Sequence, residues 1–119
     1  MGTEIKPVVS MEGTFDRLDI RVGRVVAVAQ AEGAPKPSFV ITAEFGRFGT
    51  RTSVGRFTSH EPDELIGKQI LGVLNFEPRE IGGVESEFLT LGVQVPGKES
   101  GEATIVTPLG EVKVGSKLF

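Results

Sequence analysis

An alternating pattern near the start of the chain most restricts the folds open to it. Over residues 17–22, charged and apolar side chains alternate one by one, which is the period of a strand with one buried face. The alternation slips after Gly23, where Arg24 falls on the apolar side and Val25 on the polar side. A glycine at such a slip is typical of a β-bulge. A long, bulged first strand is what a small barrel needs in order to bend around its own core.

Further strand signals follow this segment at short intervals. They predict strands over residues 38–45, 50–57, 70–76 and 88–95, with a hairpin connection at residues 46–49. A further C-terminal hairpin is predicted from residues 104–107 and 112–114. Residues 70–76 are apolar nearly throughout, which indicates a central strand.

The segment from Ser59 to Gly67 is the one predicted helix, and the helix is short. Pro62 suits the first turn, acidic residues surround it, and Gly67 suits the C-terminal end. Five strands with one short helix between the third and fourth is the order of an OB fold. The sequence therefore predicts an all-β, five-stranded Greek-key barrel with a C-terminal β extension.

The length of 119 residues fits one domain. We expect an N-terminal leader over residues 1–13 and the OB-fold domain over residues 14–119. No apolar run is long enough to cross a membrane. The first residues lack the basic start and apolar centre of a signal peptide, so the expected location is the cytoplasm.

Residue types that the chain lacks exclude several kinds of chemistry. There is no cysteine and only one histidine, His60, so disulfides, thiolate chemistry and histidine-rich metal sites are excluded within one chain. We expect no cofactor and no enzymatic activity. The formal net charge is −3, which is unfavourable for nonspecific RNA binding. Any RNA-binding surface must therefore be a local patch.

The hairpin predicted from residues 38–57, which we call the second hairpin, offers such a patch. Arg47, Arg51 and Arg56 lie on or beside it, and this face of an OB fold takes oligonucleotides. Phe48 and Phe57 could supply aromatic platforms among the arginines. The alternative is an ordinary charged edge strand. Exposed phenylalanines would instead indicate a peptide-binding surface.

The stretch from Phe76 to Gly92 carries the most specific motifs. An apolar strand leads into a loop with Pro78, a glycine pair and Ser86, and a second apolar strand follows. Together with the start of the chain, it resembles the small tRNA-binding OB-fold domains, and most closely the CsaA-type export-related chaperones. The motifs that carry the resemblance are Leu18-Asp19-Ile20-Arg21-Val22-Gly23, residues 64–69, Asn75-Phe76, Pro78-Arg79 and Gly83-x-x-Ser86.

The resemblance implies a homodimer that acts without ATP as a chaperone for unfolded or exported polypeptides, with tRNA as a further ligand. Combined with the basic patch, it predicts RNA-binding residues Arg47, Arg51, Ser53, Arg56, Asn75, Arg79 and Ser86. The predicted peptide-binding residues are Phe48, Phe57 and Phe76. No membrane insertion is expected.

The sequence is consistent with two other functional hypotheses. The first is a tRNA-binding accessory module without chaperone activity, which a local basic surface would favour. The second is a structural dimer whose RNA site has been lost. Glu80 and Glu85 lie among the predicted RNA-binding residues, and each acid near a phosphate site repels the phosphate.

Overall fold

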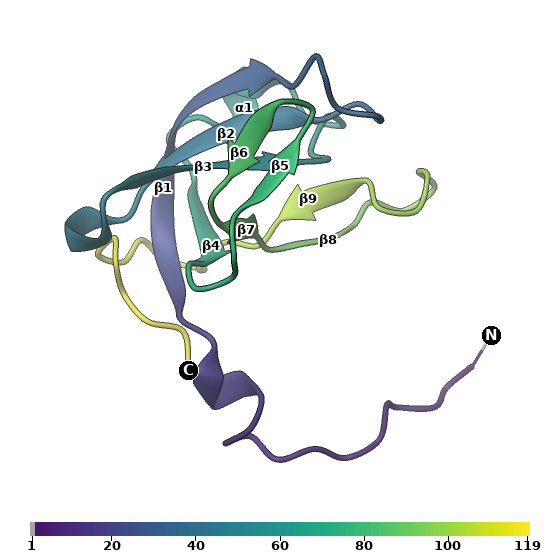
Figure 1. The fold of residues 1–119 in the computed structure, drawn as a ribbon, viewed down its shortest axis with the longest axis vertical. Coiled ribbons are helices and arrows are strands. Elements are labelled where there is room, and N and C mark those ends of the chain that lie inside the picture. The colour runs from purple at the N-terminus through teal and green to yellow at the C-terminus, as the bar shows by residue number, and fades with distance from the viewer. Residues whose placement is uncertain (1) are drawn as a thin grey trace.

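The computed structural model describes residues 2–119, and its core is one antiparallel sheet in the order β3-β2-β1-β4-β7. The strands are β1 (Ile20–Gln30), β2 (Phe39–Glu44), β3 (Thr50–Gly55), β4 (Gln69–Val73) and β7 (Leu89–Thr90). The outermost strands approach each other, since the Thr90 hydroxyl donates a 3.1 Å hydrogen bond to Ser53 Oγ, and the sheet nearly closes into a barrel (Figure 1). With the short helix α1 (Pro62–Leu65) between β3 and β4, the predicted OB fold is confirmed.

Strand β1 carries apolar side chains on both of its faces. Ile20 and Val22 pack in a cluster outside the barrel, whereas Val25 packs in the core within it. Gly23 lies where the parity changes, and a Cβ at this position would be 2.6 Å from the ring of Phe45. Glycine therefore lets the Phe45 ring lie against β1. The predicted bulge is present, but the pairing register with β2 slips directly after Val25 rather than at Gly23.

Helix α1 is a single turn that closes one end of the barrel. Glu61 and Glu64 form a reciprocal capping box, and Pro62 occupies the first turn. Leu65 is buried in the core. The chain leaves the helix through Gly67, whose φ of 88° is in the left-handed region. The helix is shorter than the predicted span of residues 59–67.

The stretch after β4, which the sequence indicated as a loop, contains a hairpin of its own. Strand β5 (Arg79–Ile81) pairs with β6 (Val84–Ser86), and the turn consists of Gly82 and Gly83. Both glycines have positive φ, 58° and 83°, as a two-residue hairpin turn requires. The β5–β6 hairpin lies against the barrel beside β3 (Figure 1).

The C-terminal part differs from the prediction. The expected fifth strand is divided: β7 stays in the barrel, and β8 (Gly92–Gln94) forms a separate hairpin with β9 (Ala103–Ile105). The predicted pairing of residues 104–107 with 112–114 is wrong. The buried Gln69 side chain occupies both backbone groups of Val112, so these groups are not available to a strand.

The chain ends differ in how they meet the barrel. Residues 2–14 form no helix or strand and run away from the barrel to the N-terminus (Figure 1). A short 3-10 turn, η1 (Phe15–Arg17), joins them to β1, and a second, η2 (Gly46–Phe48), joins β2 to β3. The C-terminal segment returns along β1, where Lys117 forms an isolated bridge with Arg21. Within residues 2–119, no helix is long and apolar enough to span a membrane.

Candidate nucleic-acid interface

The β5–β6 hairpin is attached to β3 by Ser86, a predicted RNA-binding residue, and by Glu87, which was not predicted as a contact. The backbone N–H of Val54 donates to Ser86 Oγ at 3.0 Å, and the Ser86 hydroxyl is 3.4 Å from the carbonyl oxygen of Phe88. Glu87 Oε1 accepts from both the backbone N–H and the hydroxyl of Thr52, each at 3.0 Å. Ser86 thus attaches the hairpin to the barrel, and its side chain is also partly exposed at the surface of the hairpin.

Between this hairpin and the end of β4 lies a depression of about 240 Å³, which we call the Phe76 groove. Phe76 is 47% exposed, and Arg79 is also exposed. The groove brings together three of the residues predicted from the sequence, Phe76, Arg79 and Ser86. Its floor and walls include Val54, Ile81, Glu87 and Phe88.

The Phe76 groove combines the groups that an unpaired nucleotide requires. An exposed aromatic face can stack on a base, a guanidinium can pair with a phosphate, and a hydroxyl can meet a base edge. Acidic side chains lie at the same place: Glu77 and Glu87 line the groove, and Glu80 faces Glu85 across the hairpin. These carboxylates lower the local positive potential, so stacking rather than charge is the main attraction that the groove offers.

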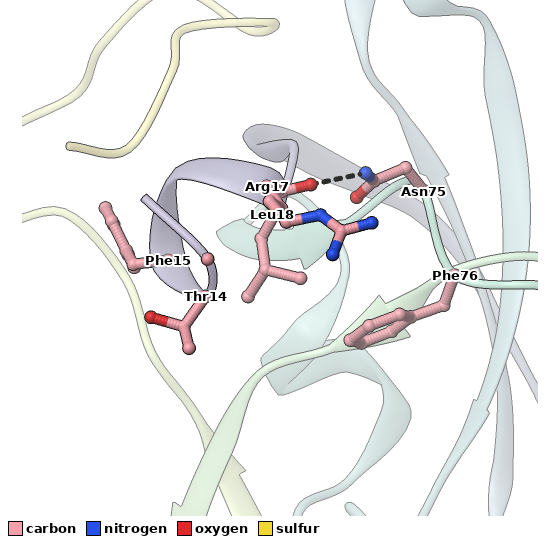
Figure 2. Close-up of a pocket in the computed structure, with 7 residues that line it drawn as sticks. Thr14, Phe15, Arg17, Leu18, Asn75 and Phe76 are labelled. Atoms are coloured by element: carbon pink, nitrogen blue, oxygen red, sulfur yellow. Dashed lines mark hydrogen bonds between the residues drawn. The ribbon is translucent and has the colours of Figure 1, made fainter. Parts of the chain in front are cut away.

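Asn75, also a predicted RNA-binding residue, forms hydrogen bonds within the chain. Its Oδ1 accepts from the backbone N–H of Asp19 at 2.8 Å, and its Nδ2 donates to the carbonyl oxygen of Arg17 at 2.8 Å. Figure 2 shows the second of these bonds beside the side chains of Leu18 and Phe76. Asn75 therefore joins the segment after β4 to η1 and the start of β1. A wider depression of about 660 Å³ lies here, lined by Phe15, Leu18 and Phe76 among others.

The arginines of the second hairpin do not form one patch. Arg51 and Arg56 lie at opposite ends of β3, about 17 Å apart at ~3.3 Å per residue. Arg51 is turned inward, with Nε 3.3 Å from the carbonyl oxygen of Phe48 and Nη1 3.5 Å from that of Leu74. Arg47 is exposed, and its guanidinium carbon lies 4.7 Å from the centre of the Phe48 ring.

Phe48, a predicted peptide-binding residue, does not present a free ring to solvent. It is half-buried and packs against the barrel core. The guanidinium of Arg21 lies over its ring at 4.6 Å, as that of Arg47 does at 4.7 Å. Cation–π contacts thus already occupy much of this ring.

Two predicted contact residues are interior residues. Ser53 is 1% exposed, and its hydroxyl group lies inside the seam between β3 and β7. Phe57 is 3% exposed and belongs to the core. Neither side chain is presented to a ligand in this structure, because Ser53 in β3 and Phe57, two residues after its end, both point into the closed barrel.

Arg56 is paired with two acidic side chains that lie more than 40 residues further along the chain, near the β8–β9 hairpin. Its Nη2 lies 2.8 Å from Glu99 Oε1 and 3.9 Å from Glu102 Oε1. Lys36, in the loop between β1 and β2, meets the same Glu99 oxygen at 3.1 Å. Lys36 was missed as a candidate; its position between Pro35 and Pro37 in a tight loop was the available signal.

The remaining polar cluster joins α1 to β9. The Nε2 of His60 lies 2.8 Å from the Thr104 hydroxyl, and its Nδ1 lies 3.7 Å from Glu64. Across the described residues 2–119, no group of three histidine, cysteine or acidic side chains is arranged to hold a metal ion.

The comparisons with known proteins bear on this surface. The family model described as "Putative tRNA binding domain" matches residues 20–117. The chain belongs to this tRNA-binding domain family. The match covers the barrel, the Phe76 groove and the β8–β9 hairpin.

Sequence relatives of this tRNA-binding domain include much longer enzymes. The methionine–tRNA ligase of Methanoculleus marisnigri is 34% identical over 112 residues, which cover 94% of this chain and 16% of the ligase. That of Phocaeicola vulgatus is 35% identical over 117 residues, which cover 96% of this chain and again 16% of the ligase. The chain thus spans about a sixth of the length of these relatives.

Solved structures of similar length share its fold. The CsaA chaperone protein of Picrophilus torridus superposes with a TM-score of 0.84 at 32% identity, covering 94% of this chain and 100% of that one. The CsaA chaperone of Bacillus anthracis gives 0.81 at 32% identity, covering 95% and 100%. The resemblance seen in the sequence motifs is therefore confirmed for both the family and the fold.

Proposed function

We propose that this chain binds tRNA and contacts unpaired nucleotides through the Phe76 groove. The observation that carries the proposal is the convergence of Phe76, Arg79 and Ser86 around one depression. Membership of the tRNA-binding domain family supports it, as do the names of the ligase relatives. The domain acts by binding, without catalysis, in the compartment where tRNA is found, the cytoplasm.

The local charges favour loops or ends of tRNA over its helical stems. Phosphate contacts dominate binding to duplex backbones, and a chain of net charge −3 with Glu77 and Glu87 in the groove is poorly suited to them. Stacking on an aromatic ring needs a base that is not paired. Unpaired nucleotides are therefore the expected ligand of Phe76.

Substitution of Phe76 tests the groove directly. Phe76→Ala should weaken tRNA binding by about five- to a hundredfold, since loss of one stacked base costs roughly 1–3 kcal/mol. The control is Phe119→Ala, which removes a fully exposed ring at the C-terminus, outside the groove. Binding is measured by anisotropy of labelled tRNA. Equal affinity of both variants would remove the Phe76 groove from the proposal.

We also propose that the chain forms a homodimer through the outer face of β1 and β4. On this face Ile20, Val22, Leu71 and Val73 form a second apolar cluster, ringed by partly buried Phe15, Leu18, Leu91, Val106 and Leu118. The four central side chains are already buried in the monomer, and a second copy would cover the surrounding ones, which are only partly buried. Leu18→Glu should shift the molar mass measured by sedimentation from dimer to monomer. A wild-type monomer at all concentrations would contradict the dimer.

Chaperone activity is a second candidate, and it is supported by the similarity to two CsaA chaperone structures. The depression beside Phe15, Leu18 and Phe76 offers apolar surface that a polypeptide side chain could fill. Binding by apolar burial needs no ATP. The chain should then suppress aggregation of an unfolded test protein without nucleotide, and Leu18→Ala should reduce the effect. No suppression at a severalfold molar excess would leave tRNA binding as the only function proposed.

A further inference from the structure

One carboxylate oxygen of Glu99 lies where two cations from different parts of the barrel meet. Lys36 Nζ approaches Glu99 Oε1 from the loop between β1 and β2 at 3.1 Å, and Arg56 Nη2 approaches it from the end of β3 at 2.8 Å. Two positive groups around a single oxygen are the arrangement in which proteins hold a phosphate oxygen. Here the oxygen is supplied by the chain itself.

Glu99 is presented by residues 95–102, which connect β8 to β9 and which we call the 95–102 turn. Gln94 organises the turn: its Nε2 donates to the carbonyl oxygen of Glu99 at 2.9 Å, and its Oε1 accepts from Gly101 N at 2.9 Å. Arg56 Nη1 donates to Ser100 O at 2.9 Å. The turn therefore lies over the guanidinium and holds the carboxylate in place.

The position of the Lys36–Arg56 pair connects it with the Phe76 groove. A pocket of about 200 Å³ beside the pair is lined by apolar groups of Pro35, Val54 and Ile81. Val54 and Ile81 also line the Phe76 groove. The Lys36 loop and the β5–β6 turn lie in contact, because a Cβ on Gly33 would be only 2.3 Å from Gly82 O. The groove and the pair are therefore neighbours, so a nucleotide chain bound in the groove has the pair within reach of its next phosphates.

The contacts that hold the turn in place are of a kind that a ligand can replace. The side chains of Glu99 and Lys36 are each 58% exposed, and exposed ion pairs contribute little to stability and weaken with salt. Arg56 Nε is buried and has no hydrogen-bond partner within residues 2–119. An unpaired buried donor is unfavourable, so the 95–102 turn covers the Arg56 guanidinium without satisfying all of its hydrogen-bond donors.

We propose that Lys36 and Arg56 form a phosphate site for single-stranded nucleic acid, and that Glu99 of the 95–102 turn occupies this site as a displaceable internal competitor. The inference rests on the proposed tRNA function for its biological ligand. It deepens that function, because the turn limits binding to ligands that can displace the carboxylate. The strand that stacks on Phe76 provides such a ligand.

Two variants of equal charge test the proposal. Glu99→Gln removes the competitor, whereas Glu111→Gln removes the same charge from the exposed pair with Arg24. Glu99→Gln should tighten tRNA binding about tenfold at low salt. The slope of log affinity against log salt should steepen by up to about 1.4, the value expected for two freed cations on a single strand. Glu111→Gln should change affinity less than about twofold, and Lys36→Ala with Arg56→Ala in the Glu99→Gln background should abolish the gain.

A second readout separates failure of this inference from failure of the tRNA proposal. Inorganic pyrophosphate should shift the Arg56 side-chain NMR signal saturably in Glu99→Gln, and much less in the wild type. If pyrophosphate binds in this way but no variant binds tRNA, the phosphate site stands and the tRNA proposal fails. If Glu99→Gln and Glu111→Gln behave alike toward tRNA, or if pyrophosphate leaves the Arg56 signal unmoved in Glu99→Gln, the inference is overturned. A merely structural turn would give lower stability with no gain in affinity.

Discussion

The side chain of Gln69 pairs with both backbone groups of Val112. Gln69 Nε2 donates to Val112 O at 2.6 Å, and its Oε1 accepts from Val112 N at 3.0 Å. Gln69 is buried at the start of β4, so these bonds hold the C-terminal segment against the barrel without a strand. The segment then continues to its contacts with β1, where Gly115 N and Leu118 N donate to Val22 O and Ile20 O.

Removal of the Gln69 amide should loosen the C-terminal segment. Gln69→Leu removes both hydrogen bonds to Val112, and we expect the free energy of unfolding to fall by about 1–3 kcal/mol, since each bond contributes roughly 0.5–1.5 kcal/mol. The control is Gln30→Leu at the exposed end of β1. Urea denaturation measures both. Equal stability of the two variants would show that the Val112 contact contributes nothing.

Gly23 should not tolerate a side chain. A Cβ at this position would lie 2.6 Å from Phe45, a ring that is fully buried against Phe88 at a centroid distance of 5.0 Å. Gly23→Ala forces this ring pair to move, and overpacking of this kind costs about 1–3 kcal/mol. Gly110→Ala is the matched control, because nothing lies within 4 Å of its added Cβ. Thermal unfolding should separate the variants by several degrees, and a stable Gly23→Ala would refute the packing argument.

Patterns local in sequence predicted the fold well. The alternation in β1, the helix signal of residues 59–67 and the hairpin connection at residues 46–49 each depend on neighbouring residues. Together they predicted the order of elements in an OB fold. The C-terminal pairing was predicted incorrectly because Gln69 and Val112 are 43 residues apart. A periodic pattern of apolar residues cannot predict that a side chain, here that of Gln69, takes the place of a neighbouring strand in the hydrogen bonding of a segment.

The site was predictable only in part, for the same reason. Phe76, Arg79 and Ser86 lie close in sequence, and they meet in one groove. Ser53 and Phe57 lie in or directly after a strand whose closure with β7 depends on distant contacts, and both are buried. Arg56 looked like a free cation because its partner, Glu99, arrives from a hairpin that the sequence did not predict.

The Glu99 ion pairs should persist at pH values below the ordinary pKa of a glutamate carboxyl, 4.5. Hydrogen bonds from Lys36, and then from Arg56, lower the pKa of this carboxyl below its ordinary value of 4.5. A depressed pKa in the folded state means that the stabilising effect is present above the ordinary value and is lost as pH falls through the lower one. The carboxyl carbon of Glu99 should therefore titrate with a midpoint below 4.5. Lys36→Ala should move the midpoint upward, whereas a wild-type midpoint at or above the ordinary value would contradict the bridged geometry.

The central claim is that the Phe76 groove binds tRNA despite the net charge of −3. The most direct measurement is tRNA affinity at two salt concentrations for the wild type, Arg79→Ala and the charge control Lys113→Ala. The account predicts binding that weakens with salt in the wild type, and a loss at Arg79→Ala that lowers the salt slope by about 0.7–0.9, with Lys113→Ala near the wild type. No tRNA binding by the wild type at low salt, or equal losses in the two variants, would contradict it.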